Sequence, residues 1–334
     1  MKKIVLLGVI AFLSHSAMVI SQYKQDSDCV DCPEEHPIVY ESSQFNVESS
    51  TEIYAQGLRH DDWMSESTEE MDLLLDIYEP VDAAENRPVI IFIHGGGYVG
   101  GSRVEFVRAG EYFAERGWVA ISIDYRLARD HGTIPQEWYD AVMQAPIFQQ
   151  QKDQALAIYA ASRDAKAAVR WVYANAETYH INTDYISVLG GSAGAGLAVM
   201  LGITEDEDFR DELTLDDDPT LESTNLDQDA EVHTVLNMWG TTAPIELLST
   251  IYDLDRFDEN DAPILIVHGT DDAVVDFSHA EYLRYEYEET GVDYAFYPLD
   301  GEGHSAWQAR VDGMMLSELA FSFITEHQQL IIGE

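Results

Sequence analysis

From Met71 onward, short apolar runs alternate with segments of helical length in this 334-residue chain. Residues 88–93 read Pro-Val-Ile-Ile-Phe-Ile, a continuous apolar run typical of a strand buried on both faces. Because strands that alternate with helices form parallel sheets, the pattern predicts a mostly parallel sheet with helices on both faces. The predicted strands are residues 73–78, 88–93, 118–123, 185–189, 235–238, 263–267 and 293–297, and the predicted helices are 103–116, 165–176, 196 onward, 278–289 and 308–326.

Two segments, residues 128–162 and 205–231, interrupt this alternation and are predicted to be insertions. Both are expected to lie where loops emerge at the carboxyl ends of parallel strands, positions that form lids or substrate-facing walls. The second insertion carries 13 acidic residues against the single base Arg210, and we favour a solvated loop for it. Its run of three aspartates lacks the glycine and terminal glutamate of a calcium-binding loop, so no metal is expected.

The first 21 residues have the order of a secretory signal peptide: two lysines, the apolar run 4–13, then small or polar residues. We therefore expect a secreted or periplasmic protein, and no run is long enough to predict a membrane span. Residues 22–70 are expected to form an acidic lead-in with one edge strand, followed by a catalytic domain at 71–334. Cys29 and Cys32 are expected to pair as a disulfide after export.

Acidic residues dominate the charge of the chain, with 62 Asp and Glu against 18 Lys and Arg and a formal net charge of −44. A field of this sign repels phosphate backbones, which excludes nucleic acid as a partner. Both a halophilic origin and simple high solubility explain such acidity, and the sequence leaves the two open. A hydrophobic content of 46% excludes a disordered chain.

Residues 190–194 read Gly-Gly-Ser-Ala-Gly and stand between a predicted strand and a predicted helix. In this context the Gly-x-Ser-x-Gly pattern predicts a nucleophile elbow, a sharp turn that projects Ser192 above the sheet. The alternative is a tight glycine-rich turn with a capping serine. Upstream, His94-Gly95-Gly96-Gly97-Tyr98 follows the strand at 88–93. The amides of Gly95, Gly96 and Ala193 are the predicted oxyanion hole.

A serine nucleophile needs a base, and the base needs an orienting acid. His304 lies in a glycine-rich loop after the last predicted strand, and Asp272 follows the strand at 263–267. We predict His304 as the base and Asp272 as the acid, with Asp271 and Asp276 as alternatives, and expect His268 to shape its own turn. Tyr98 and Trp239 are candidate pocket residues, although packing in the core explains them equally well.

The chain from about Met71 to Glu326 resembles the α/β-hydrolase superfamily, in particular carboxylesterases with a His-Gly-Gly-Gly motif. These are the hormone-sensitive-lipase-like esterases and the bacterial acetyl and feruloyl esterases. The resemblance implies an α/β-hydrolase fold with a twisted, mostly parallel eight-stranded sheet, and catalysis without a cofactor. One departure is Gly191, where many members carry an acidic residue before the nucleophile. The matching stretches are residues 87–98, 164–172, 191–194 and 268–272.

The expected function is therefore a secreted serine carboxylesterase that hydrolyses small-molecule esters or acetyl and feruloyl esters borne by polysaccharides. A lipase, a polyester hydrolase, and an amide or peptide hydrolase of the same fold are alternatives. A hydrolase-fold binding module without activity is an alternative of another class, disfavoured because every catalytic position is filled. The sequence does not determine the acyl chain length, the alcohol or the oligomeric state.

Overall fold

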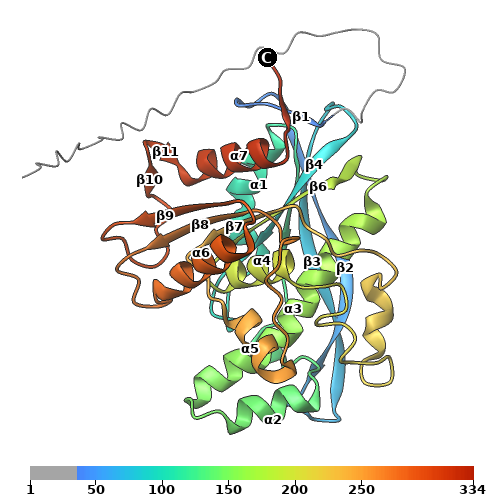
Figure 1. Cartoon of the computed structure of the whole chain (residues 1–334). Helices are drawn as coiled ribbons and strands as arrows, with labels where there is room; N and C mark the ends of the chain where they lie inside the picture. The colour runs from blue at the N-terminus through green and yellow to red at the C-terminus, as the bar shows by residue number, and fades with distance from the viewer. Residues whose placement is uncertain (1–35) are drawn as a thin grey trace, which may run out of the picture. The chain divides into compact units, whose positions relative to one another are not determined.

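The computed structural model describes residues 36–334, which form one compact unit (Figure 1). The predicted signal peptide and the Cys29–Cys32 pair lie outside the described residues. No helix within the described range is both long and apolar enough to cross a membrane.

A central sheet of eight strands runs through residues 36–334, in the spatial order β2-β3-β5-β4-β6-β7-β8-β9. The strand β3 pairs antiparallel with both β2 and β5, and all other neighbours in the sheet are parallel. The prediction of a mostly parallel eight-stranded α/β-hydrolase sheet is confirmed. The strands are β2 (Val47–His60), β3 (Thr68–Pro80), β4 (Arg87–Ile93), β5 (Val119–Ile123), β6 (Ile181–Gly191), β7 (Thr234–Met238), β8 (Ile264–Gly269) and β9 (Tyr294–Leu299).

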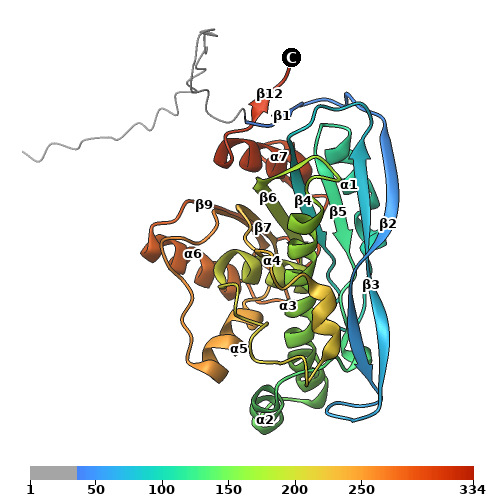
Figure 2. The same ribbon diagram turned by 90° about the vertical axis from the view of Figure 1, so that its right-hand side faces the viewer.

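Helices cover both faces of the sheet (Figures 1 and 2). The central strand β4 shows why, because all its side chains are buried and successive ones enter different cores. Ile91 belongs to the core that also contains residues of α3, α4, α5 and α6, whereas Phe92 belongs to the core that contains residues of α1 and α7. The helices are α1 (Val107–Ala114), α2 (Gln136–Gln144), α3 (Gln149–Asn175), α4 (Ala193–Ile203), α5 (Ala243–Tyr252), α6 (Ser278–Thr290) and α7 (Leu316–His327), with short 3₁₀ turns η1 (Arg103–Phe106), η2 (Ala128–Asp130) and η3 (Pro219–Thr224).

Two short strand pairs lie beside the main sheet within the described range. A parallel pair joins β1 (Ile38–Val39) to β12 (Ile331–Ile332), which ties together the two ends of the compact unit. An antiparallel pair joins β10 (Arg310–Val311) to β11 (Met314–Met315). Because β10 and β11 occupy the start of the helix predicted at 308–326, the observed helix α7 begins only at Leu316.

The sheet begins with β2, which takes the place of the edge strand expected within residues 22–70, so the fold extends upstream of the predicted start at residue 71. This strand pairs with β3 along its whole length, from Val47 opposite Pro80 to His60 opposite Thr68, and forms the curved hairpin at the edge of the sheet in Figure 2. Its first half is mostly exposed and polar, so the sequence pattern indicated an acidic lead-in rather than a long strand. The compact unit therefore begins at His36.

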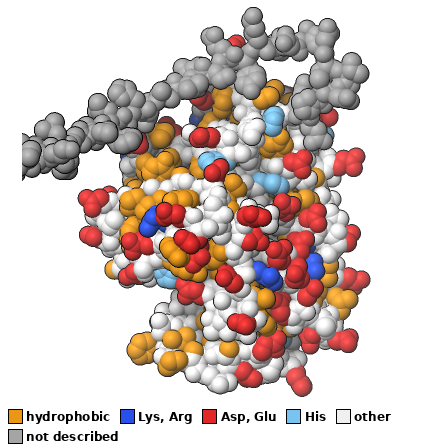
Figure 3. Space-filling view, viewed as in Figure 1, with side chains coloured by type: hydrophobic (Ala, Val, Ile, Leu, Met, Phe, Trp, Pro, Cys, Tyr) orange, Lys and Arg blue, Asp and Glu red, His pale blue; other side chains and the backbone are white. Residues whose placement is uncertain are grey.

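The two predicted insertions are more ordered than expected. Residues 128–162 contain η2, α2 and the first half of the helix α3, so this segment is helical and only partly loop. The acidic segment 205–231 is not simply solvated, because Asp208 and Asp218 are buried in it. Asp218 pairs with Arg163 of α3 at 2.6 Å, and Asp208 pairs with Arg256 at 2.7 Å. Other acidic side chains are spread over the visible face of the molecule (Figure 3).

Candidate active site

Ser192 occupies the turn between β6 and α4, with φ 56° and ψ −121°. A positive φ is uncommon for serine and marks a strained backbone. Neighbouring glycines make the turn possible, since a Cβ atom at Gly194 would collide with the carbonyl oxygens of Ile93 and His94. A Cβ atom at Gly190 would likewise collide with the backbone of Gly194. The turn therefore has the backbone strain and close approach of a nucleophile elbow.

The structure brings the side chains of Ser192, His304 and Asp272 together. Nε2 of His304 lies 2.9 Å from Oγ of Ser192, and Nδ1 of His304 lies 2.7 Å from Oδ2 of Asp272. A carboxylate only accepts hydrogen bonds, so Nδ1–H donates to Asp272 and Nε2 is left to accept the hydroxyl proton of Ser192. Of the alternative acids, Asp276 instead accepts a hydrogen bond from the amide of Ser278. The contact with His304 belongs to Asp272.

Asp272 is 8% exposed and held by several donors. Its Oδ1 accepts hydrogen bonds from the amides of Val274 at 2.8 Å and Val275 at 3.0 Å. Burial alone would raise the pKa of Asp272, but the hydrogen bonds from His304 and the two amides outweigh burial and hold this pKa below its usual value. Asp272 is therefore a carboxylate at neutral pH, as an acid that orients an imidazolium must be.

The predicted oxyanion amides lie beside the serine. A Cβ atom at Gly95 would lie 3.3 Å from Cβ of Ser192, so the backbone of Gly95 passes directly against the nucleophile. Gly96 has φ 105°, a conformation that favours glycine. Ala193 begins α4, where the first backbone amides have no acceptor within the helix and carry partial positive charge. These three positions can present donors to a developing oxyanion.

Aromatic packing fixes the loop that carries the glycines. The ring of His94 stacks on Tyr125, with ring centroids 4.2 Å apart and an interplanar angle of 13°. The hydroxyl of Tyr125 donates to the carbonyl of His94 at 2.8 Å, and Nδ1 of His94 lies 2.8 Å from the carbonyl of Gly95. His94 is buried, which lowers its pKa, so it acts here as a neutral structural group.

A cavity of about 750 Å³ opens beside Ser192 and His304. The predicted pocket residue Trp239 lines this cavity, although the residue is only 1% exposed. Sequence reasoning missed Trp307, Phe106 and Met238, whose side chains form other parts of the wall. The one available signal was the position of Trp307, three residues beyond His304.

A second cavity, of about 540 Å³, also reaches Ser192. Its wall includes Gln151, Gln154 and Ile158, so the predicted insertion at 128–162 does face the site. The other pocket candidate, Tyr98, lines this cavity with its ring, while its hydroxyl donates to the carbonyl of Ala193 at 3.2 Å. Tyr98 therefore both bounds the site and secures the elbow.

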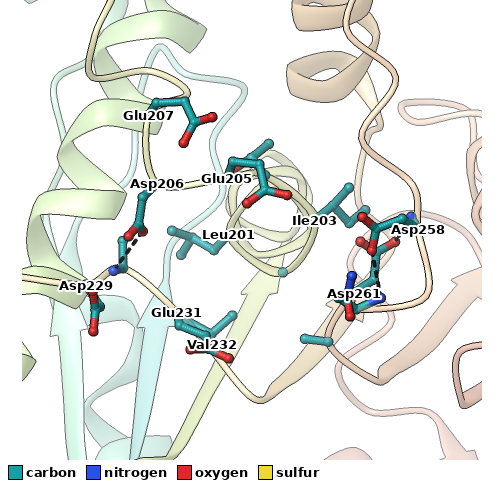
Figure 4. A pocket seen from close by; sticks show the side chains of 15 residues that line it. Leu201, Ile203, Glu205, Asp206, Glu207, Asp229, Glu231, Val232, Asp258 and Asp261 are labelled. Carbon is teal, nitrogen blue, oxygen red and sulfur yellow. Dashed lines mark hydrogen bonds between the residues drawn. The ribbon is translucent and has the colours of Figure 1, made fainter.

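The acidic insertion lines a different cavity, of about 450 Å³, whose wall includes neither Ser192 nor His304 (Figure 4). Acidic side chains from residues 205–207, Asp229, Glu231, Asp258 and Asp261 surround it. Within residues 36–334, no three His, Cys, Asp or Glu side chains are arranged to hold a metal ion. The cluster is thus an acidic pocket without metal-binding geometry.

The fold and the serine elbow define an α/β hydrolase. Residues 75–158 and 151–256 match the sequence profile of the BD-FAE family, and together they cover more than half of the chain. The chain belongs to the BD-FAE family, which confirms the resemblance to hormone-sensitive-lipase-like carboxylesterases.

Curated relatives include esterases from Mycobacterium tuberculosis. Esterase LipC of strain ATCC 25618 / H37Rv is 26% identical over 231 residues, which are 62% of this chain and 50% of LipC. Carboxylesterase NlhH of the same strain is 29% identical over 137 residues, which are 40% of this chain and 35% of NlhH. The chain spans half or less of the length of these relatives.

Solved structures share the fold. Esterase 2 of Thermogutta terrifontis with propionate bound superposes with a TM-score of 0.60 at 24% identity, over 86% of this chain and 97% of that one. The same esterase phosphoramylated by tabun superposes with a TM-score of 0.57 at 24% identity, over 83% and 94% of the two chains. At this identity the likeness supports the α/β-hydrolase fold alone.

Proposed function

We propose that the protein hydrolyses carboxylic esters through an acyl-enzyme on Ser192. The observation that carries this proposal is the 2.9 Å contact between Nε2 of His304 and Oγ of Ser192, with Asp272 bonded to the other ring nitrogen. The esterase relatives and the family membership support the same reaction class.

The reaction proceeds in two acyl transfers. Oγ of Ser192 bonds to the ester carbonyl carbon while His304 takes the hydroxyl proton, and the amides of Gly95, Gly96 and Ala193 receive the oxyanion. The carbon to alcohol-oxygen bond then breaks, and the alcohol leaves with the proton from His304. Water, deprotonated by the same imidazole, attacks the acyl-enzyme and releases the carboxylic acid and free Ser192. Asp272 stabilises the imidazolium in both halves.

The proposed setting is extracellular or periplasmic, and the proposed substrates are acetyl or feruloyl esters, free or borne by polysaccharides. The signal-peptide pattern of the first 21 residues supports export. Two cavities that meet at Ser192 give separate space to the acyl and alcohol parts of an ester. No resident cofactor takes part in the proposed cycle, since Ser192, His304, Asp272 and backbone amides supply each group it needs.

Replacement of the nucleophile tests the proposal. Ser192→Ala is expected to abolish p-nitrophenyl acetate hydrolysis and labelling by a fluorophosphonate probe, because both need Oγ. The thermal unfolding temperature should stay close to that of the wild type. Ser322→Ala, at an exposed position of α7, is the matched control and should keep full activity and labelling. Esterase activity that survives Ser192→Ala, or a wild type that the probe does not label, would refute the assignment.

A substrate screen tests the proposed substrate class. Acetylated xylan, methyl ferulate and p-nitrophenyl esters of graded length separate polysaccharide esterase from general esterase activity. A p-nitroanilide series separates ester from amide hydrolysis. Turnover of anilides at the rate of the matching esters would favour an amidase instead.

A further inference from the structure

Trp307 lies in the wall of the 750 Å³ cavity that also contains Ser192 and His304. Its indole makes edge-to-face contacts with Trp239, at a centroid distance of 4.6 Å, and with Phe106, at 5.9 Å. Trp239 and Phe106 are both buried, but 37% of Trp307 is exposed. The buried rings therefore support one partly exposed indole at the edge of the site.

Gly191 makes room for this indole. A Cβ atom at position 191 would lie 2.8 Å from Cζ2 of Trp307, closer than carbon atoms pack, and 3.4 Å from Cη2. Any other residue before the nucleophile would push the indole away from the elbow. The missing side chain at Gly191 thus leaves the space that Trp307 occupies, although the two residues are 116 positions apart in the sequence.

The position of His304 indicates which part of an ester meets Trp307. The general acid must lie within hydrogen-bond reach of the leaving oxygen, so the alcohol departs on the side of His304. His304 and Trp307 line the same cavity. The lining of the second cavity includes Tyr98 and Ala193 but neither His304 nor Trp307, which leaves that side for the acyl group.

We propose that Trp307, seated against Gly191, is a specificity-determining residue that selects esters whose alcohol carries a six-membered ring with an apolar face. The inference rests on the proposed esterase function and goes beyond it by naming the alcohol class. An aromatic ring or the C–H face of a pyranose packs against an indole, whereas a short acyclic alcohol covers little of it. Phe106 and Trp239 hold the indole in place for this contact.

Two acetates with alcohols of similar acidity provide the test. The ratio of kcat/KM for benzyl acetate to that for ethyl acetate is expected to fall about five- to tenfold in Trp307→Ala, the usual size of one aromatic contact. Trp307→Phe should retain most of the ratio because it keeps a ring. The ratio for ethyl butyrate to ethyl acetate, which varies the acyl side, should stay within about twofold. A methyl 6-O-acetylglucopyranoside distinguishes a pyranose from an aryl alcohol.

Gly191→Ala tests the pairing. Its added methyl group displaces the indole, so this variant should lower the benzyl to ethyl ratio as Trp307→Ala does. In the double variant the two changes should not add, because the second removes a contact already lost. Gly100→Ala is the matched control, since a Cβ atom there has no heavy atom within 4 Å.

Three outcomes would overturn the inference: unchanged ratios for both ring alcohols in Trp307→Ala, a shift confined to the acyl series, or additive effects of the two substitutions. Each of these three outcomes can be measured only if the wild-type protein is active. A wild type that hydrolyses none of these esters and resists the fluorophosphonate probe contradicts the proposed function itself, so the two failures are distinguishable.

Discussion

Nε2 of His268 lies 3.3 Å from Oδ2 of Asp272, the same carboxylate oxygen that bonds His304. The Nε2 atom also lies 2.9 Å from the carbonyl oxygen of Val275, which only accepts, so this nitrogen carries the hydrogen. Burial lowers the pKa of His268 and keeps the ring neutral. Asp272 is therefore held between two imidazoles, and His268 does more than shape its own turn.

Exchange of the acid tests this arrangement. Asp272→Asn should lower kcat for p-nitrophenyl acetate by roughly 10³ to 10⁴-fold, because an amide stabilises neither the required tautomer nor the imidazolium. Asp271→Asn, one residue away, is the matched control and should stay near wild-type activity. Steady-state kinetics of both variants provide the measurement. Equal losses in the two variants would show that the wrong carboxylate had been assigned.

Tyr98→Phe separates the two contacts of that residue. The variant keeps the ring that bounds the second cavity but loses the hydrogen bond from the hydroxyl to the carbonyl of Ala193. We expect a loss of about 1 kcal/mol in the free energy of unfolding, typical of one buried hydrogen bond. Ratios of kcat/KM among esters of graded acyl length should not change, since the ring remains. A change in acyl selectivity without loss of stability in urea unfolding would contradict this account.

The site residues that the sequence predicted are those that local sequence patterns identify. Ser192, Asp272 and His304 each follow a recognisable apolar strand, and parallel strands bring their carboxyl ends to one edge of the sheet. An edge strand was expected within residues 22–70, and β2 takes that place, but its bounds could not be predicted because its exposed half carries none of the apolar alternation that indicates a strand.

Contacts between distant segments could not be predicted in this way. Phe106 and Trp307 are 201 positions apart, and neither has a local pattern that indicates a shared cavity. The acidic insertion was interpreted from its polarity alone. Polarity predicts exposure only for unpaired charges, and the 2.6 Å partner of Asp218, Arg163, lies on α3, far from Asp218 in the chain.

The ion pair between Asp218 and Arg163 makes a prediction about stability. Both side chains are at most 1% exposed, so Asp218→Ala leaves a buried guanidinium without its 2.6 Å partner. The free energy of unfolding should fall by about 3 to 5 kcal/mol. Asp216→Ala, in the same run of three aspartates but exposed, should change it by less than about 0.5 kcal/mol. Equal effects in urea unfolding would mean that the insertion is held by something other than this pair.

The acidic pocket of Figure 4 predicts a pH dependence of stability that centres on Asp261. Burial, followed by the charges of Asp258, Glu205 and Asp255, raises the pKa of Asp261 to about 8. An unfolded aspartate has a pKa near 3.9, so between these values the folded state holds a proton that the unfolded state has lost. The contribution of Asp261 to the free energy of unfolding is therefore greatest below pH 4. This contribution declines as the pH rises toward 8.

Asp261→Asn should remove that decline. The amide oxygen can still accept the hydrogen bond from the amide of Asp258, and no charge has to form in the pocket as the pH rises. At pH 8 the free energy of unfolding of the variant should exceed that of the wild type by about 1 to 2 kcal/mol. This value is reduced because Asp261 is partly in contact with water. Thermal unfolding at pH 5 and pH 8 measures the difference, with the exposed pocket residue Asp229→Asn as control. If Asp261→Asn and the wild type lost equal stability between the two pH values, Asp261 would not be the group that titrates.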